Sequence, residues 1–284
     1  MDAEELLAQA KKTLRSSNER FGFKGEEEDQ AWELLVQALG GEEPEYEDEI
    51  PAGVKRRFDR FIARRATGEP IAYIVGEVEF RDLQLGIKPG MFIPRYTSEF
   101  LALQAIRRLH GRPRPVHVDL ATGIGPVALS SAKAVPGARV WGLDISQKAL
   151  NQATANASSL GLRNVRFKRS DLFSALSAGL RGKVDVVTIH PPYVPRKEVA
   201  DLPDEIKKFE PGHTLSDGSH DGLGLVRRVV AEGHEWIRPG GWLLIEIVPS
   251  EFRSVRPLLR EAGYGEIRST HGQLRHTRVI TGRV

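Results

Sequence analysis

A glycine-containing turn that follows a short apolar run is the first feature of this chain with the chemistry of a cofactor site. The apolar run spans 116–120, the turn reads Asp-Leu-Ala-Thr-Gly-Ile-Gly over 119–125, and a helix is expected over 126–134. Glycines at a strand-to-helix turn let the backbone approach a ligand, and the helix N-terminus offers unpaired N–H groups. The pattern therefore predicts a ligand at the carboxyl end of a strand.

The spacing of the small residues leaves two cofactor classes open. Gly123, Gly125 and Ala128 satisfy the G-x-G-x-x-G/A pattern of dinucleotide sites. Asp144 ends the next predicted strand, nineteen residues after Gly125, where a carboxylate can bind ribose hydroxyls. Both nicotinamide dinucleotides and S-adenosylmethionine contain a ribose, so these residues alone do not separate the two.

Two further carboxylates favour S-adenosylmethionine. Asp119 lies four residues before Gly123, where it would repel a pyrophosphate and face the cationic methionine end of a sulfonium cofactor. Asp171 follows a third predicted strand, where it can accept a hydrogen bond from an adenine amine. We expect S-adenosylmethionine to be bound, and S-adenosylhomocysteine to be the product, at ten residues: Asp119, Ala121, Thr122, Gly123, Gly125, Asp144, Ile145, Asp171, Leu172 and His190.

A second motif, His190-Pro191-Pro192-Tyr193, ends another apolar run and is typical of a site for a planar nitrogen. The two prolines fix φ and remove backbone donors, so the carbonyls at the strand end remain as acceptors. Those acceptors can bind the N–H groups of a substrate, and the Tyr193 ring can stack on the same plane. We predict His190, Pro191 and Tyr193 to be the catalytic residues.

Strands that alternate with helices predict an α/β fold built on a mainly parallel sheet covered on both faces. We expect strands over 116–120, 140–143, 165–167, 184–189, 242–247, 265–269 and 277–281, and helices over 126–134, 146–160, 223–237 and 251–262.

The first quarter of the chain has helical rather than strand periodicity. Apolar residues repeat at helical spacing around 6–14, 32–39 and 58–62, and Gly40-Gly41 ends the second repeat. Alternation around Arg81-Asp82 predicts a β-hairpin. We therefore expect a helical domain over 1–75, a β-hairpin linker over 76–95 and an α/β domain over 96–284.

Several other segments match one known family. They are Gly68-Glu69-Pro70-Ile71-Ala72-Tyr73-Ile74-Val75-Gly76, Phe92-Ile93-Pro94-Arg95 with Glu99, Asp221-Gly222-Leu223, and Gly240-Gly241-Trp242-Leu243-Leu244. Nearly the whole chain resembles the HemK/PrmC-like family, whose best-known members methylate the glutamine side chain of translation release factors. The resemblance implies a class I, Rossmann-like methyltransferase with a seven-stranded sheet, an N-terminal helical bundle and a β-hairpin linker. It also implies that the Pro-Pro-Tyr segment holds the substrate nitrogen, that 1–75 is a substrate-recognition domain and that 96–284 is the methyltransferase domain.

The sequence departs from the family pattern at the site itself. The family motif begins with Asn where His190 stands, and the family loop reads Pro-Arg-Pro-Glu-Thr-Glu where this chain has Pro-Arg-Tyr-Thr-Ser-Glu over 94–99. Ala121 replaces a glycine of the turn. An Asn side chain binds a primary amide through one donor and one acceptor, whereas a neutral imidazole cannot copy that fork but can accept a proton.

The His190 departure leads us to expect a basic or planar nitrogen substrate. The expected substrate is a small, amino-acid-like molecule, for example an arginine-like one, and the alternative is a release factor glutamine. A third alternative is a protein that binds S-adenosylmethionine without catalysis. The predicted substrate-binding residues are Arg95, Glu99, His190, Pro191, Pro192, Tyr193 and Glu246.

Charge is unevenly distributed in a chain of 284 residues whose net charge is +3. Acidic clusters lie over 26–29 and 42–49, and the remainder is rich in arginine. A solvated surface is one explanation for these clusters. The other is an acidic N-terminal surface that attracts a cationic partner.

Composition excludes several classes of function. The absence of cysteine rules out disulfides, cysteine zinc sites and thiol catalysis, and the histidines show no ligand spacing, so no metal is expected. No apolar run is long enough for a membrane span and no signal peptide is apparent, so we expect a cytoplasmic protein. We expect no nucleic-acid partner, since no basic, aromatic-interleaved stretch is visible. We expect no NAD binding, since Asp119 would repel its pyrophosphate.

Overall fold

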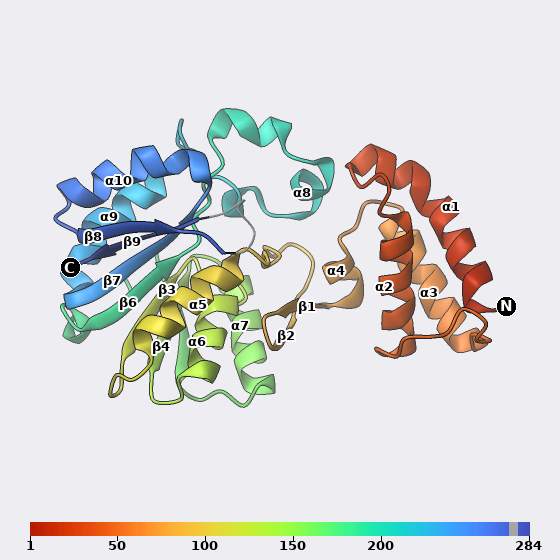
Figure 1. The fold of residues 1–284 in the computed structure, drawn as a ribbon, viewed down its shortest axis with the longest axis horizontal. Helices are drawn as coiled ribbons and strands as arrows, with labels where there is room; N and C mark the ends of the chain where they lie inside the picture. Colours follow the sequence, from red (N-terminus) through yellow and green to blue (C-terminus); the bar gives the residue numbers. More distant parts are fainter. Residues whose placement is uncertain (273–277) are drawn as a thin grey trace. The chain divides into compact units, whose positions relative to one another are not determined.

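The structure is a computed structural model that describes residues 1–272 and 278–284. It divides into two compact units (Figure 1). One contains 1–77, 88–90 and 200–210, and the other contains 78–87, 91–199 and 211–284. We describe each unit by itself.

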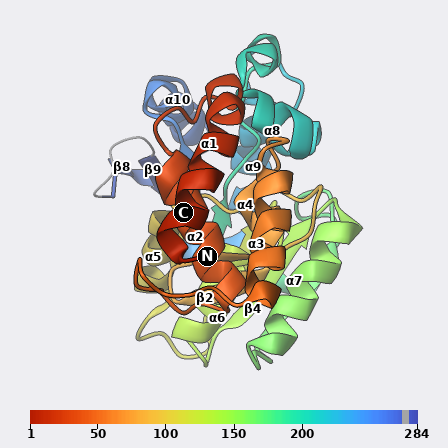
Figure 2. The same cartoon turned by 90° about the vertical axis from the view of Figure 1, so that its right-hand side faces the viewer.

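The first unit is built from helices. These are α1 (Ala3–Phe21), α2 (Glu27–Leu39), α3 (Ala52–Arg65), α4 (Ile71–Val75) and α8 (Asp204–Phe209). The first three lie side by side (Figure 2), and their apolar faces form a core that includes Leu6, Leu14, Leu34, Leu35 and Phe58. The predicted helical periodicity is therefore found where it was expected, and Gly40 ends α2 with a φ of 86°.

Arg65 is a buried charge at the centre of this unit. Its side chain is 3% exposed, and its guanidinium donates to Gln30 Oε1 at 3.0 Å and to the Glu69 carbonyl at 3.1 Å. It also pairs with Glu205 at 3.0 Å and lies 4.8 Å from the centre of the Phe23 ring. Because Glu205 is remote in sequence, this one side chain ties the 200–210 segment to the helical bundle.

The second unit contains a hairpin and a seven-stranded sheet. The hairpin is β1 (Glu77–Phe80) and β2 (Leu83–Gly86), joined at Arg81 with a φ of 56°. Asn156 of α7 (Gln147–Ser159) donates to the Gly86 carbonyl at 3.1 Å, so the hairpin is fastened to the unit that carries the sheet.

The sheet has the strand order β5-β4-β3-β6-β7-β9-β8. Its strands are β3 (Val116–Leu120), β4 (Arg139–Asp144), β5 (Val165–Arg169), β6 (Val184–Ile189), β7 (Ile237–Ile247), β8 (Gly265–Thr270) and β9 (Arg278–Arg283). Strand β9 runs antiparallel to both of its neighbours, and the pairs from β5 to β7 are parallel. This confirms the expected α/β fold with a mainly parallel, seven-stranded sheet.

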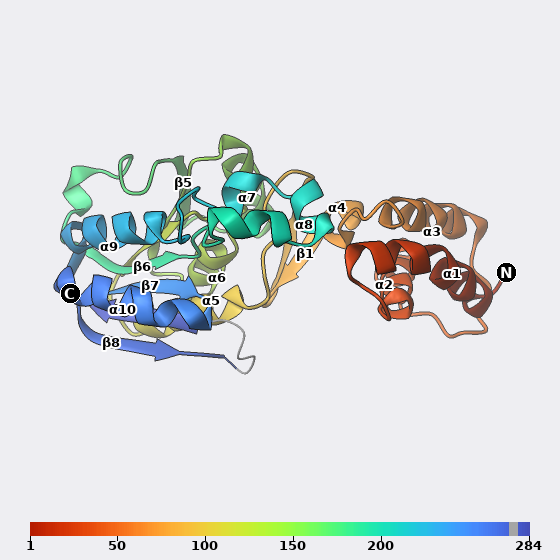
Figure 3. The ribbon, with the colours of Figure 1, turned by 90° about the horizontal axis from the view of Figure 1, so that it is seen from above.

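Helices cover both faces of the sheet (Figures 1 and 3). Helices α5 (Ser98–Leu109), α6 (Pro126–Ala134) and α7 lie on one side, and α9 (Gly224–Trp236) and α10 (Phe252–Glu261) lie on the other. Short 3-10 turns occur at Ala178–Leu180, Arg196–Asp201, Gly212–Thr214 and Pro249–Glu251. Every residue of β3 and of β6 is buried, as expected of strands covered on both faces.

The main elements missing from the sequence prediction are α4, α5, α8 and the 3-10 turns. Strands β3 and β6 have the predicted bounds, whereas β7 begins at Ile237 rather than at Trp242 because an irregular register extends its pairing with β6. The last predicted strand begins at Thr277, which lies outside the described residues.

Replacing Arg65 should destabilise the protein strongly. R65M removes the buried guanidinium from its ion pair with Glu205 and from its hydrogen bonds to Gln30 Oε1 and the Glu69 carbonyl, which costs about 3–5 kcal/mol. Urea unfolding followed by far-UV circular dichroism measures the change. The control is K11M, which removes an ion pair whose two side chains are more than half exposed and should leave the midpoint unchanged. Equal midpoints for R65M and the wild type would contradict the role given to Arg65.

Candidate active site

The predicted cofactor turn and the predicted catalytic motif meet at one point of the sheet. Strands β3 and β6 are neighbours, but β3 is followed in the chain by β4 on its other side. This is a topological switch point, where ligands of open α/β sheets bind at the carboxyl ends of the strands. The turn over 119–125 leaves β3 and the segment 190–193 leaves β6, so both lie at this edge.

Asp144 organises the glycine turn. Its two carboxylate oxygens accept from the Gly123 and Ser146 N–H groups, each at 2.8 Å. Burial raises the pKa of Asp144, and the two N–H donors oppose that shift. Each carboxylate oxygen has a second lone pair, so Asp144 can still accept from ligand hydroxyls.

The two glycines of the turn have different roles. Gly123 has a φ of 57°, and a Cβ there would meet no atom within 4 Å, so the turn leaves open space at this point. Gly125 has a φ of 91°, and a Cβ would lie 3.0 Å from the Phe167 ring and 3.1 Å from Leu129. Gly123 therefore fits close approach of a ligand, whereas Gly125 is required by packing beneath the turn. Ala121 occupies a position with a φ of 50°, which favours the family's glycine.

Asp119 is a buried carboxylate held by two hydroxyls. The Thr122 and Thr188 hydroxyls donate to its two oxygens, each at 2.6 Å, and the side chain belongs to a residue that is 2% exposed. Burial raises the pKa of Asp119 to about 7, while the two hydroxyl donors lower it and the charge of Asp144 raises it. Asp119 therefore titrates near neutral pH.

The remaining predicted cofactor residues line the same edge with different exposure. Ile145 is 53% exposed, which is unusual for a large apolar side chain and fits an apolar surface for a nucleoside. Leu172 is buried with a φ of 46°. Asp171 is exposed and pairs with Arg228 at 3.0 Å, so its carboxylate is engaged with the protein surface. The open turn, the two carboxylates and Ile145 together fit S-adenosylmethionine.

His190 lies in a polar and aromatic cluster. Its Nδ1 is 3.0 Å from Ser98 Oγ and 3.8 Å from Glu246 Oε2. Its ring stacks on Tyr193 with ring centres 5.5 Å apart and an interplanar angle of 25°. Phe92 meets the same imidazole edge-on at 5.5 Å. Because Nδ1 faces Ser98 and Glu246, Nε2 is the nitrogen that remains for a substrate.

Glu246 is the buried carboxylate behind this imidazole. Its side chain is 1% exposed, and its Oε1 accepts from the Thr97 hydroxyl at 3.1 Å. Within the described part of the chain its Oε2 has no hydrogen-bond partner. Sequence reasoning included Glu246 but missed Thr97 and Ser98 as its neighbours, although both replace residues of the family loop and that departure was the available signal.

Tyr193 is held in place through its backbone. A short antiparallel bridge pairs it with Ser216, and the Val194 N–H donates to the Leu215 carbonyl at 3.0 Å. Gly222, with a φ of 73°, lies directly against this segment, since a Cβ there would be 2.0 Å from the Tyr193 carbonyl oxygen. Burial and the charges of Glu246 and Glu251 raise the pKa of the Tyr193 phenol to about 12, so the phenol stays neutral.

The other predicted substrate residues differ in how they meet this cluster. The Arg95 guanidinium lies 4.6 Å from the centre of the Phe92 ring and thus joins the His190 cluster. Pro191 is buried and Pro192 is partly exposed beside it. Glu99 accepts from the Arg81 N–H at 2.8 Å, which gives it a structural role at the hairpin turn. Substrate binding by Glu99 stays a prediction.

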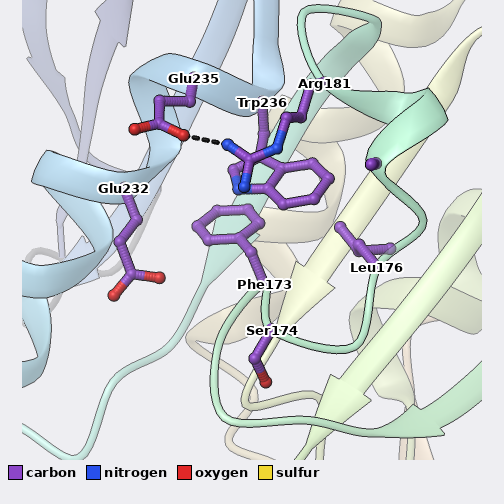
Figure 4. A pocket seen from close by; sticks show the side chains of 8 residues that line it. Phe173, Ser174, Leu176, Arg181, Glu232, Glu235 and Trp236 are labelled. Carbon is purple, nitrogen blue, oxygen red and sulfur yellow. Dashed lines mark hydrogen bonds and ion pairs between the residues drawn. The ribbon is translucent and has the colours of Figure 1, made fainter.

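A separate pocket of about 200 Å³ lies between α9 and the loop after β5 (Figure 4). Trp236 stacks on Phe173, Arg181 lies 4.6 Å from the Trp236 ring centre, and Arg181 pairs with Glu235. None of the predicted site residues lines it, so it is not the cofactor site. Among residues 1–272 and 278–284, no group of three potential metal-ligating side chains occurs, and no helix is long and apolar enough to cross a membrane.

Comparisons with known proteins agree with both units. A family described as "PrmC N-terminal domain" matches residues 5–76, and one described as "Methyltransferase domain" matches 115–247. A crystal structure of a methyltransferase from Pyrococcus furiosus has the same fold, with a TM-score of 0.53 and 16% identity, over 80% of this chain and 98% of that one.

Two curated relatives are named release factor glutamine methyltransferase. One from Burkholderia pseudomallei is 37% identical and covers 83% of this chain and 85% of its own length. Another from Gloeobacter violaceus is 39% identical over 70% and 69%. The fold and the site are those of a class I methyltransferase. The chain belongs to the release factor glutamine methyltransferase family and is an S-adenosylmethionine-dependent N-methyltransferase.

Any side chain at Gly222 should displace Tyr193. G222A places a Cβ on the Tyr193 carbonyl and adds the cost of a positive φ, so we expect a loss of about 2–4 kcal/mol in the free energy of unfolding.

The matched control is G218A in the same loop, where φ is also positive but no atom lies within 4 Å. It should cost only about 1 kcal/mol of backbone strain. Urea unfolding measures the loss in the free energy of unfolding for G222A and for G218A. Equal losses would show that the contact between position 222 and Tyr193 is unimportant.

Proposed function

We propose that this enzyme methylates the side-chain amide nitrogen of a glutamine in a peptide chain release factor. The observation that supports this most is the similarity to relatives with that name at 37% identity over 85% of their length. The match of the N-terminal family to residues 5–76 supports it as well, because the similarity then extends beyond the catalytic domain. These comparisons favour the release factor over the small-molecule substrate expected from the sequence.

S-adenosylmethionine is the proposed cofactor, and it supplies a methyl group already activated on a sulfonium. Asp144 would hold the ribose hydroxyls, Asp119 would face the cationic methionine end, and Ile145 would cover the nucleoside. Asp119 and Asp144 are fixed by hydrogen bonds of 2.6–2.8 Å, so they need no rearrangement to receive a ligand. Preorganisation of this kind lowers the entropic cost of binding.

The substrate nitrogen would lie between the His190 imidazole and the Tyr193 ring. Pro191 and Pro192 lack N–H groups, so this strand end offers acceptors to the nitrogen's hydrogens. Alignment of nucleophile and methyl donor is the main contribution that such a site can make to the rate. The nitrogen must also lose a proton when it gains a methyl group, and an amide nitrogen, once methylated, releases that proton to water without a base from the protein.

We also propose that residues 1–75 take part in substrate recognition, with the hairpin as the link to the methyltransferase domain. The acidic clusters over 26–29 and 42–49 belong to this part of the chain, and most of their residues are exposed. Such a surface would attract a basic protein or a cationic small molecule.

Methyl transfer from labelled S-adenosylmethionine tests the proposed substrate. We expect labelling of a purified release factor and loss of that label when its acceptor glutamine is replaced by alanine. A panel of free amino acids serves as the comparison. Labelling of an amino acid but not of the release factor would overturn the proposal, and the absence of any labelling despite cofactor binding would favour a non-catalytic protein.

One observation favours a second candidate, a basic nitrogen such as a guanidinium or an ammonium. Glu246 is buried with one oxygen unpaired among the described residues, 3.8 Å from an imidazole that replaces the family's Asn. An imidazole can accept a proton, which the carboxamide of the family's Asn cannot do. A protonated nitrogen needs such an acceptor, whereas an amide mainly needs orientation.

The H190N variant separates these two substrates. A carboxamide offers one donor and one acceptor to an amide but cannot accept a proton. If the substrate is glutamine, H190N should retain or raise the rate. If the substrate is a basic nitrogen, H190N should lower the rate at least a hundredfold, since general bases contribute about 10²–10⁴. E246Q, measured beside it, should lower only the rate with a basic nitrogen.

A further inference from the structure

We propose that His117 and Thr188 are positioning residues for the cofactor site, because they hold Asp119 as an ionised acceptor for the ligand's ammonium group. Neither residue was predicted as part of the site, and neither is placed to contact a ligand. The inference concerns cofactor binding alone, so it holds whatever the methyl acceptor is.

The sheet register brings the three side chains together. His117 and Asp119 are two residues apart on β3, so both point to the same face, and Thr188 of β6 is the direct partner of Asp119. The distances are 2.8 Å from His117 Nε2 to Thr188 Oγ1 and 2.6 Å from Thr188 Oγ1 to Asp119 Oδ1. All three residues are at most 2% exposed, so water does not compete for these contacts.

The direction of the hydrogen bonds follows from counting protons. A threonine hydroxyl has one hydrogen, and an ionised Asp119 can only accept it. The Thr188 oxygen must then accept from His117, which requires the hydrogen of the neutral imidazole to be on Nε2. Burial lowers the pKa of His117 to about 3, so the ring stays neutral at every pH at which the enzyme would work.

The reverse direction is disfavoured by the other imidazole nitrogen. If Asp119 were protonated and donated to Thr188, the Thr188 hydroxyl would have to donate to His117 Nε2, and the ring hydrogen would move to Nδ1. Within the described part of the chain, Nδ1 is buried without a partner. A buried, unpaired N–H is costly, so the chain of hydrogen bonds favours the ionised Asp119.

This preference for the ionised carboxylate matters because burial and a neighbouring charge favour the protonated form of Asp119. Burial raises its pKa to about 7, and Asp144 on β4 adds the repulsion of a like charge. Thr122 from the turn and Thr188 from β6 are the side-chain donors that oppose the shift. Without Thr188 the carboxyl would be mostly protonated at neutral pH and would not attract a cation.

The test measures binding of S-adenosylhomocysteine by calorimetry between pH 6 and 9, without any methyl acceptor. For the wild type, affinity should fall about tenfold for each pH unit below about 7, because binding must then release the Asp119 proton. In T188V the onset of this fall should move upward by about one pH unit, while T188S should match the wild type. S-adenosylhomocysteine itself titrates in the same way with every variant. A difference between two profiles of affinity against pH therefore reports the protonation of Asp119.

The control is S131A, which removes a buried hydroxyl without a partner among the described residues and should leave the profile unchanged. Circular dichroism verifies that each variant is folded. Superimposable profiles for folded T188V and wild type would overturn the proposal. If T188V does not fold, nitrogen-15 NMR of the wild type decides, since His117 must be the Nε2–H tautomer between pH 8 and 9, where Asp119 is ionised. A protonated ring or the Nδ1–H tautomer there would overturn it.

Discussion

A carboxylate lies inside the most buried part of a parallel sheet, and the site around it depends on how that carboxylate is kept ionised. Asp119 is in a strand whose five residues are all buried, where a charge is costly unless donors surround it. The polar residues of β3, β6 and the glycine turn meet this need with hydrogen bonds of 2.6–2.8 Å. The same bonds fix the carboxyl ends of the two strands that form the switch point.

The part of the site around His190 is more exposed than the surroundings of Asp119. His190 is partly exposed and lies among aromatic rings, with two groups on its Nδ1 side that differ in nature, a serine hydroxyl and a buried carboxylate. Thr97 ends the loop before α5 and Ser98 begins that helix, where the sequence departs from its family. The residues at 97, 98 and 190 that depart from the family pattern therefore form one spatial cluster.

The sequence was sufficient to predict the two strands that carry the site residues. Strands β3 and β6 are short, mainly apolar runs, followed by a glycine turn and by two prolines respectively, and their bounds were predicted correctly. Helix α5 was missed because a proline-containing loop hides its start, and α8 was missed because six residues without an apolar face give no periodicity. The environment of Asp119 depends on register between strands 69 residues apart, and no local pattern contains that information.

The residues of the site also divide into those that the sequence identified and those that it did not. The carboxylates at strand ends were identifiable because a strand end at a switch point is a place where ligands bind. The structural role of Glu99 at the hairpin turn could not be identified from the sequence, because its partner is a backbone N–H. Thr188 was overlooked because a threonine in a strand is ordinary, and only its position opposite Asp119 makes it important.

The buried pair of Arg65 with Glu205 has a consequence for how the chain can be divided. Residues 200–210 belong to the helical unit although they are inserted in the methyltransferase sequence, so the two units do not correspond to two continuous stretches of chain. A shortened protein that begins at residue 78 would keep Glu205 without its arginine and Lys208 without the Thr67 carbonyl to which it donates. The helical unit and the catalytic sequence are therefore expected to be gained, lost or exchanged in evolution only as a whole.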